Sequence, residues 1–223
     1  MIYSRQCMFP EGLVSKIKHI CFDLDGTLID SFPIMKVAWE SSMAALNLNC
    51  KFSEYKKYVG MPFPTILELL DLSGYEKELS KLYFSNTKRL TEDVKTFYGI
   101  HEVFNWTSKV GISTSIITAK PRENAEFLCN KLNIPIAFQV CGDDHRHGKP
   151  NAFVADAVLK KFEVLPSEIL YVGDMAVDFQ FALNVGMRFV FFDGNGINKL
   201  PENLVNEIET ISCLTELMSH SCS

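Results

Sequence analysis

The sequence predicts an α/β fold, a doubly wound and mainly parallel sheet with a small inserted α-helical domain. Two observations predict it. Five short apolar runs are each bounded by Gly, Asp or Pro, and helical patterns separate the later runs. The interval after the first run instead holds four successive helical patterns and no convincing strand. Strands that alternate with helices form βαβ units, and a long helical interval after one strand indicates an insert.

The apolar runs show no alternation of polar and apolar residues, as expected of parallel strands covered by helices on both faces. They span 19–24, 115–118, 138–141, 169–172 and 188–192. Helical patterns follow at 123–132, 152–162 and 179–185, and we expect a short helix in the tail 208–223.

The inserted segment is expected to form its own small helical bundle over the carboxyl end of the first strand. Its helical patterns span 33–48, 53–58, 64–70 and 75–91. Pro and Gly residues at 33 and 99 supply the hinges. The predicted domains are therefore a core of residues 1–31 and 99–223, and an insert of residues 32–98, here called the cap.

Composition narrows the function classes. The chain has 223 residues, 47% hydrophobic and 22% charged, which is the balance of a globular protein. A net charge of -5 without a basic block disfavours nucleic acid, and an anionic substrate would need a locally recruited cation. No apolar run reaches 18 residues, and the seven cysteines form no C-x-x-C pair. We therefore expect a cytoplasmic protein with reduced thiols, away from membranes, as a monomer or homodimer.

Chemically reactive side chains follow four of the predicted strands. Because ligands bind at the carboxyl ends of strands in open α/β sheets, we expect these side chains to converge. They are Asp23 and Asp25 after the first run, Thr118 after the second, Lys149 after the third, and Asp174 and Asp178 after the fourth. Each alone could be a turn, a helix cap or a solvated face, but clustered like charges are hard to explain by stability.

This set of residues suits phosphoryl transfer. Converging carboxylates need a hard cation such as Mg²⁺, which also attracts an anionic substrate. Asp23 could then attack phosphorus as a nucleophile, and Asp25, beside the flexible Gly26, could act as general acid and then general base. Thr118, the amide of Ala119 and Lys149 could hold the phosphoryl oxygens.

At these residues the chain resembles the haloacid dehalogenase superfamily, in its phosphatase branch. The motifs are Asp23-Leu24-Asp25-Gly26-Thr27, Thr118, Lys149-Pro150, and Gly173-Asp174 through Asp178. The resemblance implies a Rossmann-like core with a type 1 helical cap. It further implies that Asp23 is the nucleophile, Asp25 the acid/base, and that Gly26, Thr27, Thr118, Ala119 and Lys149 bind substrate. Mg²⁺ would lie on Asp23, Asp174 and the backbone carbonyl of Asp25, with Asp178 in support.

The expected function is a Mg²⁺-dependent phosphatase for a small phosphorylated metabolite, a sugar phosphate or a phosphoglycolate-like compound, acting through an aspartyl-phosphate. A phosphomutase of the β-phosphoglucomutase type remains open. A catalytically silent binding protein is the less favoured alternative, because scaffolding does not need all of these reacting groups. Ala119 and Asn151-Ala152 depart from residues common in phosphoglycolate phosphatases, which weakens assignment to that substrate.

Three further groups of residues near the motifs have alternative interpretations. The loop 143–147 resembles a metal-ligand cluster, but we expect a polar loop that helps to sort substrates. Trp39, Met43, Tyr83 and Phe84 are expected in the core of the cap rather than on substrate. Lys88 and Arg89 could reach a second anionic group of a ligand.

Overall fold

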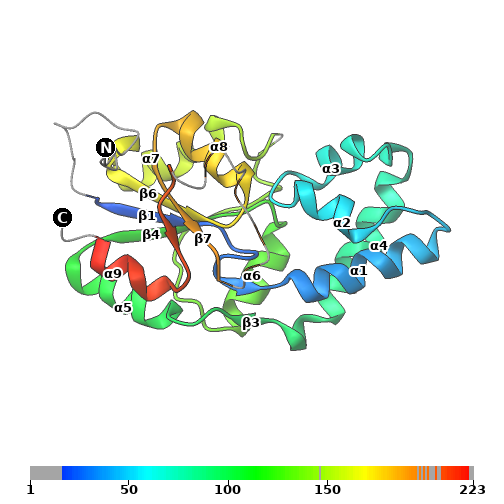
Figure 1. The fold of residues 1–223 in the computed structure, drawn as a ribbon, viewed down its shortest axis with the longest axis horizontal. Helices are drawn as coiled ribbons and strands as arrows, with labels where there is room; N and C mark the ends of the chain where they lie inside the picture. The colour runs from blue at the N-terminus through cyan, green and yellow to red at the C-terminus, as the bar shows by residue number, and fades with distance from the viewer. Residues whose placement is uncertain are drawn as a thin grey trace, which may run out of the picture.

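A six-stranded parallel sheet forms the centre of the computed structural model (Figure 1). The structure describes residues 17–145, 147–194, 196, 198, 200, 204 and 207–220. In the order β5-β4-β1-β6-β7-β8, the strands are β5 (Gln139–Val140), β4 (Ser113–Ile117), β1 (His19–Phe22), β6 (Ile169–Gly173), β7 (Arg188–Phe192) and β8 (Thr210–Ile211). The five predicted runs are all strands, and β8 is an additional one. The chain order changes direction at the central β1, which is where a doubly wound sheet binds its ligands.

Helices cover both faces of this sheet, as the unbroken apolar runs predicted. Ile20 and Phe22 of β1 pack in a cluster with residues of the helices at 100–110, 122–131 and 217–220. Cys21 packs in another cluster, with residues of the helices at 156–162 and 176–185. The helices of the core are α5 (Ile100–Val110), α6 (Arg122–Lys131), η4 (Ala152–Ala155), α7 (Asp156–Phe162), η5 (Pro166–Glu168), α8 (Ala176–Val185), η6 (Leu214–Glu216) and α9 (Leu217–His220), where η marks a 3₁₀ helix.

The cap stands beyond one end of the sheet and has its own hydrophobic core (Figure 1). Trp39 is fully buried there, stacked on Tyr55 with 4.2 Å between ring centroids. The helices are α1 (Phe32–Ala45), α2 (Phe52–Tyr55), η1 (Lys56–Tyr58), α3 (Phe63–Leu69), η2 (Ser73–Tyr75), α4 (Glu76–Arg89) and η3 (Thr91–Asp93). Each of the four predicted patterns corresponds to one or more of these helices.

A short antiparallel ribbon joins the cap to the core. It consists of β2 (Ile29–Asp30) and β3 (Lys95–Thr96), with Ile29 opposite Thr96 and Asp30 opposite Lys95. The expectation of no strand between the first two runs was therefore wrong: two-residue strands are too short to leave an apolar pattern. The ribbon lies beside the predicted domain boundaries, which stay a prediction.

Within the described residues, no helix combines the length and the apolar character that crossing a membrane requires. The cysteines in this part of the chain, Cys21, Cys50, Cys129, Cys141 and Cys213, are free thiols. Cys7 and Cys222 lie outside the described residues.

Candidate active site

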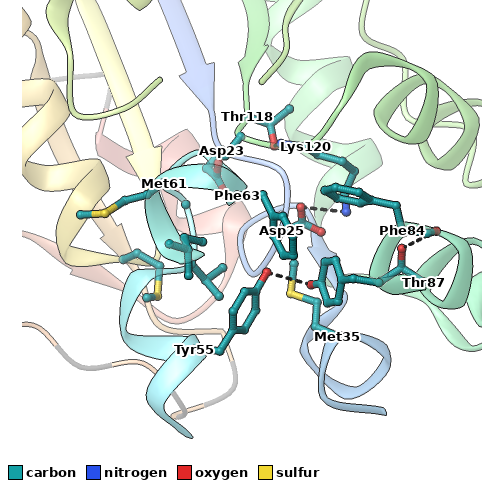
Figure 2. Close-up of a pocket in the computed structure, with 16 residues that line it drawn as sticks. Asp23, Asp25, Met35, Tyr55, Met61, Phe63, Phe84, Thr87, Thr118 and Lys120 are labelled. Atoms are coloured by element: carbon teal, nitrogen blue, oxygen red, sulfur yellow. Dashed lines mark hydrogen bonds and ion pairs between the residues drawn. The ribbon is translucent and has the colours of Figure 1, made fainter. Parts of the chain in front are cut away.

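The carboxyl ends of the central strands bring the predicted side chains to one edge of the sheet. Asp23 follows β1, Thr118 follows β4 and Asp174 follows β6, while Lys149 comes from the loop after β5. All four are buried. Figure 2 shows Asp23 and Thr118 side by side where their two strands end. The convergence predicted from the sequence is therefore present.

A tight turn after β1 brings two motif residues against Asp174. The amides of Leu28 and Ile29 both donate to the carbonyl of Leu24, and Gly26 has a φ of 90°. A Cβ atom on Gly26 would lie 2.1 Å from Oδ2 of Asp174, so only glycine fits this approach. The Thr27 hydroxyl donates to Oδ1 of Asp174 at 3.1 Å. Thr27 thus orients this carboxylate and does not line the cavity described below.

Three buried carboxylates lie close together, and two of them contact the ammonium of Lys149. Oxygens of Asp23, Asp174 and Asp178 lie within 4.8 Å of one another. The Lys149 Nζ donates to Oδ1 of Asp23 at 2.5 Å and to Oδ1 of Asp178 at 2.6 Å. It also donates to the Tyr171 hydroxyl at 3.1 Å, which in turn donates to a backbone carbonyl of β4. Lys149 is thereby fixed on its two carboxylates.

Burial and the repulsion between neighbouring carboxylates shift the pKa values of Asp23 and Asp174. Burial raises the pKa of Asp23 to about 7, although the Lys149 charge acts in the opposite direction. Burial, Asp178 and Asp23 together hold the pKa of Asp174 well above its usual range. Burial works to lower the pKa of Lys149, but Asp178 and Asp23 outweigh it and hold this pKa well above its ordinary value.

A divalent cation fits this cluster. Three carboxylates against one ammonium leave an excess of negative charge when all are ionised, and an all-oxygen donor set suits a hard cation. The amide of Asn198, which the motifs did not reveal, also donates to Oδ2 of Asp174. Asp25 does not join this group of carboxylates, and both of its side-chain oxygens have other partners, so its backbone carbonyl is left for the metal role expected from the resemblance.

Asp25 is held by two residues that sequence reasoning missed. Its Oδ2 lies 3.1 Å from Nζ of Lys120, and its Oδ1 accepts a hydrogen bond from the Ser31 hydroxyl at 2.6 Å. The Lys120 side chain is only 8% exposed, so water does little to stabilise its charge, and Asp25 supplies the opposite charge. The position of Lys120, two residues after Thr118, indicates that it lies at the same edge of the sheet, but it does not reveal the pairing with Asp25.

The backbone after β4 presents Thr118 and Ala119 to the site. The Thr118 amide donates to Val140 of β5 at 2.9 Å, and its hydroxyl accepts from the Lys120 amide at 3.2 Å. Both Thr118 and Ala119 line a cavity at this edge of the sheet.

This cavity lies between the core edge and the cap and encloses about 550 Å³, part of it open to solvent (Figure 2). The core side includes Asp23, Asp25, Thr118 and Lys120. The cap side includes Tyr55, Phe63, Tyr83, Phe84, Met35 and Met61.

The structure bears on two groups of neighbouring residues. Lys88 pairs with Glu123 of α6 at 2.7 Å, and neither Lys88 nor the exposed Arg89 lines this cavity. Lys88 lines a smaller pocket beside it, together with Thr87 and Lys120, and the suggestion that Lys88 and Arg89 reach a second anionic group of a ligand stays a prediction. Tyr83 and Phe84 line the cavity as well as packing in the cap, whereas Trp39 and Met43 are core residues as expected.

The loop 143–147 serves the start of α6. Asp143 accepts from the Arg122 amide at 2.9 Å, and Asp144 accepts from the Arg122 guanidinium at 2.5 Å. The described residues of this loop do not line the cavity and do not join a metal-binding group. Arg146 lies outside the described residues, and the substrate-sorting role of the loop stays a prediction.

Comparisons with known proteins agree with this geometry. Residues 20–192 match the model of the family described as haloacid dehalogenase-like hydrolase. A phosphoglycolate phosphatase of Pseudomonas savastanoi pv. phaseolicola is 29% identical over 185 residues, which cover 78% of this chain and 68% of that protein. Pyrophosphatase PpaX of Oceanobacillus iheyensis is 26% identical over 160 residues, 71% of this chain and 75% of that protein. The crystal structure of a hydrolase from Pseudomonas syringae has a TM-score of 0.82 at 23% identity, covering 92% of this chain and 97% of that one.

Proposed function

The chain belongs to the haloacid dehalogenase-like hydrolase family, and on this basis we propose that it is a Mg²⁺-dependent phosphatase that forms an aspartyl-phosphate on Asp23. That it is a hydrolase acting on phosphate esters follows from the family and from relatives named phosphatase and pyrophosphatase. One observation carries the finer proposal: Asp23 and Asp25 both line the same cavity, and each has its own lysine partner.

In the first step, a carboxylate oxygen of Asp23 attacks phosphorus, and the bond between phosphorus and the leaving oxygen breaks. Asp25 gives its proton to that leaving oxygen as a general acid. The hydroxyl of Thr118, the amide of Ala119 and the ammonium of Lys149 are proposed to stabilise the phosphoryl oxygens as charge develops on them. Burial of Asp23 strengthens these interactions because water is excluded.

In the second step, water attacks the phosphorus of the aspartyl-phosphate, and Asp25 removes its proton as general base. The bond between phosphorus and Asp23 breaks, so inorganic phosphate leaves and the carboxylate is restored. Lys120 balances the negative charge of Asp25 in the form that this step requires, and Ser31 fixes its direction. Both partners thereby support Asp25 facing the cavity.

The metal is proposed to lie on Asp23, Asp174 and the backbone carbonyl of Asp25, with Asp178 supporting the site through its contacts with Lys149 and the Met175 amide. When bound, Mg²⁺ would neutralise the carboxylates and the phosphoryl oxygens that face them.

Phosphate release from a panel of small phosphomonoesters tests the function, with Mg²⁺ and with excess chelator. The wild type should release free phosphate only with Mg²⁺, and Asp23→Asn should release none. Asp156→Asn serves as the matched control, because Asp156 is exposed and lies on α7 away from the cavity. Full activity of Asp23→Asn, or an isomerised ester in place of free phosphate, would refute the proposal.

A further inference from the structure

The two sides of the cavity differ in chemical character (Figure 2). The core side carries the charged groups Asp23, Asp25 and Lys120. The cap side carries four aromatic rings with aliphatic and thioether groups around them. A phosphoryl group held at the core edge would therefore point its leaving group at the cap surface.

The aromatic rings of the cap form one packed surface. Phe63 and Tyr83 are stacked, with centroids 5.0 Å apart and planes at 15°. Phe84 meets both rings, at 5.1 Å from Phe63 and 5.3 Å from Tyr83. Tyr83 is buried, whereas Phe84 is partly exposed. Their mutual packing fixes the shape of this surface, which favours a leaving group with an apolar face.

The polar groups on the cap side are mostly engaged with one another. The Tyr55 hydroxyl donates to the Tyr83 hydroxyl at 3.0 Å, and the Thr87 hydroxyl donates to the carbonyl of Phe84 at 3.0 Å. A leaving group with many hydroxyls would therefore lose hydrogen bonds to water without replacing them all.

No cationic side chain lines the cap side, in the part of the chain that the structure describes. Lys88 pairs with Glu123 and lines a smaller neighbouring pocket, not this cavity. Lys56 lies over the ring of Phe32, 5.0 Å from its centroid, outside the cavity lining. The cation within the described lining is Lys120, and Asp25 already balances its charge. A second anionic group on the substrate would thus be desolvated without a partner, near the two aspartates.

We propose that the physiological substrate is a phosphomonoester whose leaving group is uncharged and presents an apolar or aromatic face to Phe63, Tyr83 and Phe84. This inference rests on the proposed phosphatase function and narrows its substrate class. It places phosphoglycolate and inorganic pyrophosphate, each with a second anionic group, among the poor substrates.

The test uses matched pairs that differ by one charge. The wild type, with Mg²⁺, is assayed for kcat/KM on propyl phosphate and phosphoglycolate, and on benzyl phosphate and 4-carboxybenzyl phosphate. The second pair has a remote carboxylate, so leaving-group chemistry is nearly equal within it. We expect the uncharged member to be favoured by roughly 100-fold in each pair. A hexose 6-phosphate is expected to fall below benzyl phosphate.

A binding measurement separates recognition from chemistry. Calorimetric titration with benzylphosphonate and 4-carboxybenzylphosphonate, which resist hydrolysis, should give the tighter dissociation constant for the uncharged compound. Phe84→Lys should then improve binding and turnover of the carboxylated compounds relative to the uncharged ones, by about tenfold. Ser85→Lys adds the same charge at the next position of α4, which is exposed, and should leave both ratios unchanged.

The outcomes distinguish the two proposals. If the wild type hydrolyses none of the esters with Mg²⁺, the phosphatase proposal fails and this inference falls with it. If the esters are hydrolysed but a charged member or the hexose phosphate is preferred, the phosphatase proposal stands and this inference is overturned. A melting temperature for each variant establishes that it is folded, and the wild-type comparison decides the question without any variant.

Discussion

The ammonium of Lys120 lies 3.1 Å from Oδ2 of Asp25, so the residue two positions beyond Thr118 balances a carboxylate that follows the neighbouring strand β1. Both side chains are nearly inaccessible to solvent, with 8% and 9% of their surface exposed. An ion pair at such burial leaves a costly unpaired charge when one partner is removed. Lys120 therefore has a specific and measurable part in the proposed chemistry.

Lys120→Met should lower kcat by about 10- to 100-fold, because Asp25 loses the charge that stabilises its basic form and fixes its position. Lys120→Arg keeps the charge and should recover part of the activity. Lys88→Met removes the exposed ion pair with Glu123 and should stay near wild type. Steady-state kinetics on one alkyl phosphate provide the comparison, and equal kcat values for the wild type and Lys120→Met would remove Lys120 from the mechanism.

Alanine variants of Asp23 and Asp25 should differ in how their activity depends on the leaving group of the substrate. An alkoxide needs a proton from Asp25 to depart, whereas a nitrophenolate is already stable near neutral pH. Asp25→Ala should therefore lose turnover of an alkyl phosphate, yet release one burst of nitrophenolate from nitrophenyl phosphate and stall as an aspartyl-phosphate. Asp23→Ala should show neither burst nor turnover. Rapid mixing with mass spectrometry of the quenched protein checks this, and phosphate on a residue other than Asp23 would show the roles to be misassigned.

Metal binding should stabilise the fold through the carboxylate cluster. Mg²⁺ at 100 times its dissociation constant should add about 2.7 kcal/mol to the free energy of unfolding. Asp174→Asn removes one of the three clustered carboxylates and should lose most of this gain, while Asp156→Asn should keep it. Ca²⁺ should also stabilise the protein but support little turnover, because its larger shell misplaces the nucleophile. Thermal denaturation in chelator and in each metal measures these effects, and an undiminished Mg²⁺ response in Asp174→Asn would place the metal elsewhere.

Gly26→Ala should abolish activity, because its Cβ would collide with the Asp174 carboxylate in addition to straining the backbone. Gly111→Ala is the matched control: Gly111 also has positive φ, 76°, but a Cβ there meets nothing within 4 Å. Both variants should lose about 1 to 2 kcal/mol from backbone strain. Urea unfolding of the two variants measures the loss from backbone strain, and their activity measures the effect of the collision with Asp174. Equal activity of the two variants would show that the close approach of Gly26 to Asp174 has no role in catalysis.

His19 should make the fold less stable in mild acid. It is buried in β1 between the hydroxyls of Ser113 and Ser115, and burial lowers its pKa from 6.5 to about 4. At pH values between about 4 and 6.5, His19 therefore binds a proton in the unfolded chain but not in the folded chain. The free energy of unfolding consequently falls as the pH falls through this range. The loss should be about 2 kcal/mol between pH 7 and pH 5. The free energy of unfolding in urea is measured for the wild type and His19→Gln at pH 7 and pH 5. The wild type should lose about 2 kcal/mol more than the variant between these pH values, and an equal loss in both proteins would contradict the prediction.

The sequence predicted those parts of the fold that leave a local pattern. The run 169–172 is apolar because Leu170 and Tyr171 of β6 are buried on opposite faces of the sheet. Strands β2, β3 and β8 have only two residues each, and each pairs with a strand distant in the sequence, so none of them leaves a local pattern. Helix α5 did have a helical spacing, with Ile100, Val103, Phe104 and Thr107 buried on one face, and it was overlooked.

The candidate site was predictable where residues follow strands, because strand ends converge whatever the loops do. Asp23, Thr118 and Asp174 needed only that rule. The pairing of Lys120 with Asp25 and the contribution of Asn198 depend on side-chain direction and on a loop remote in sequence, which spacing does not encode. The cap surface was beyond prediction for the same reason, since Tyr83 and Phe84 could equally have been interior residues.

The chain passes from the core into the cap at β2 and returns to the core at β3, which pairs with β2. This arrangement affects how the substrate range of such an enzyme can change in evolution. Ile29 and Thr96 are paired neighbours, so residues between them leave and re-enter the core at one place, much as the loop of a hairpin does. The core can therefore accommodate inserts of different lengths at this place, because the ends that it must join are already adjacent and the cost of closing a longer loop rises only slowly. Recombination could therefore replace the whole cap, with its aromatic surface, as a single segment, while Asp23 and Lys149 keep their places in the core.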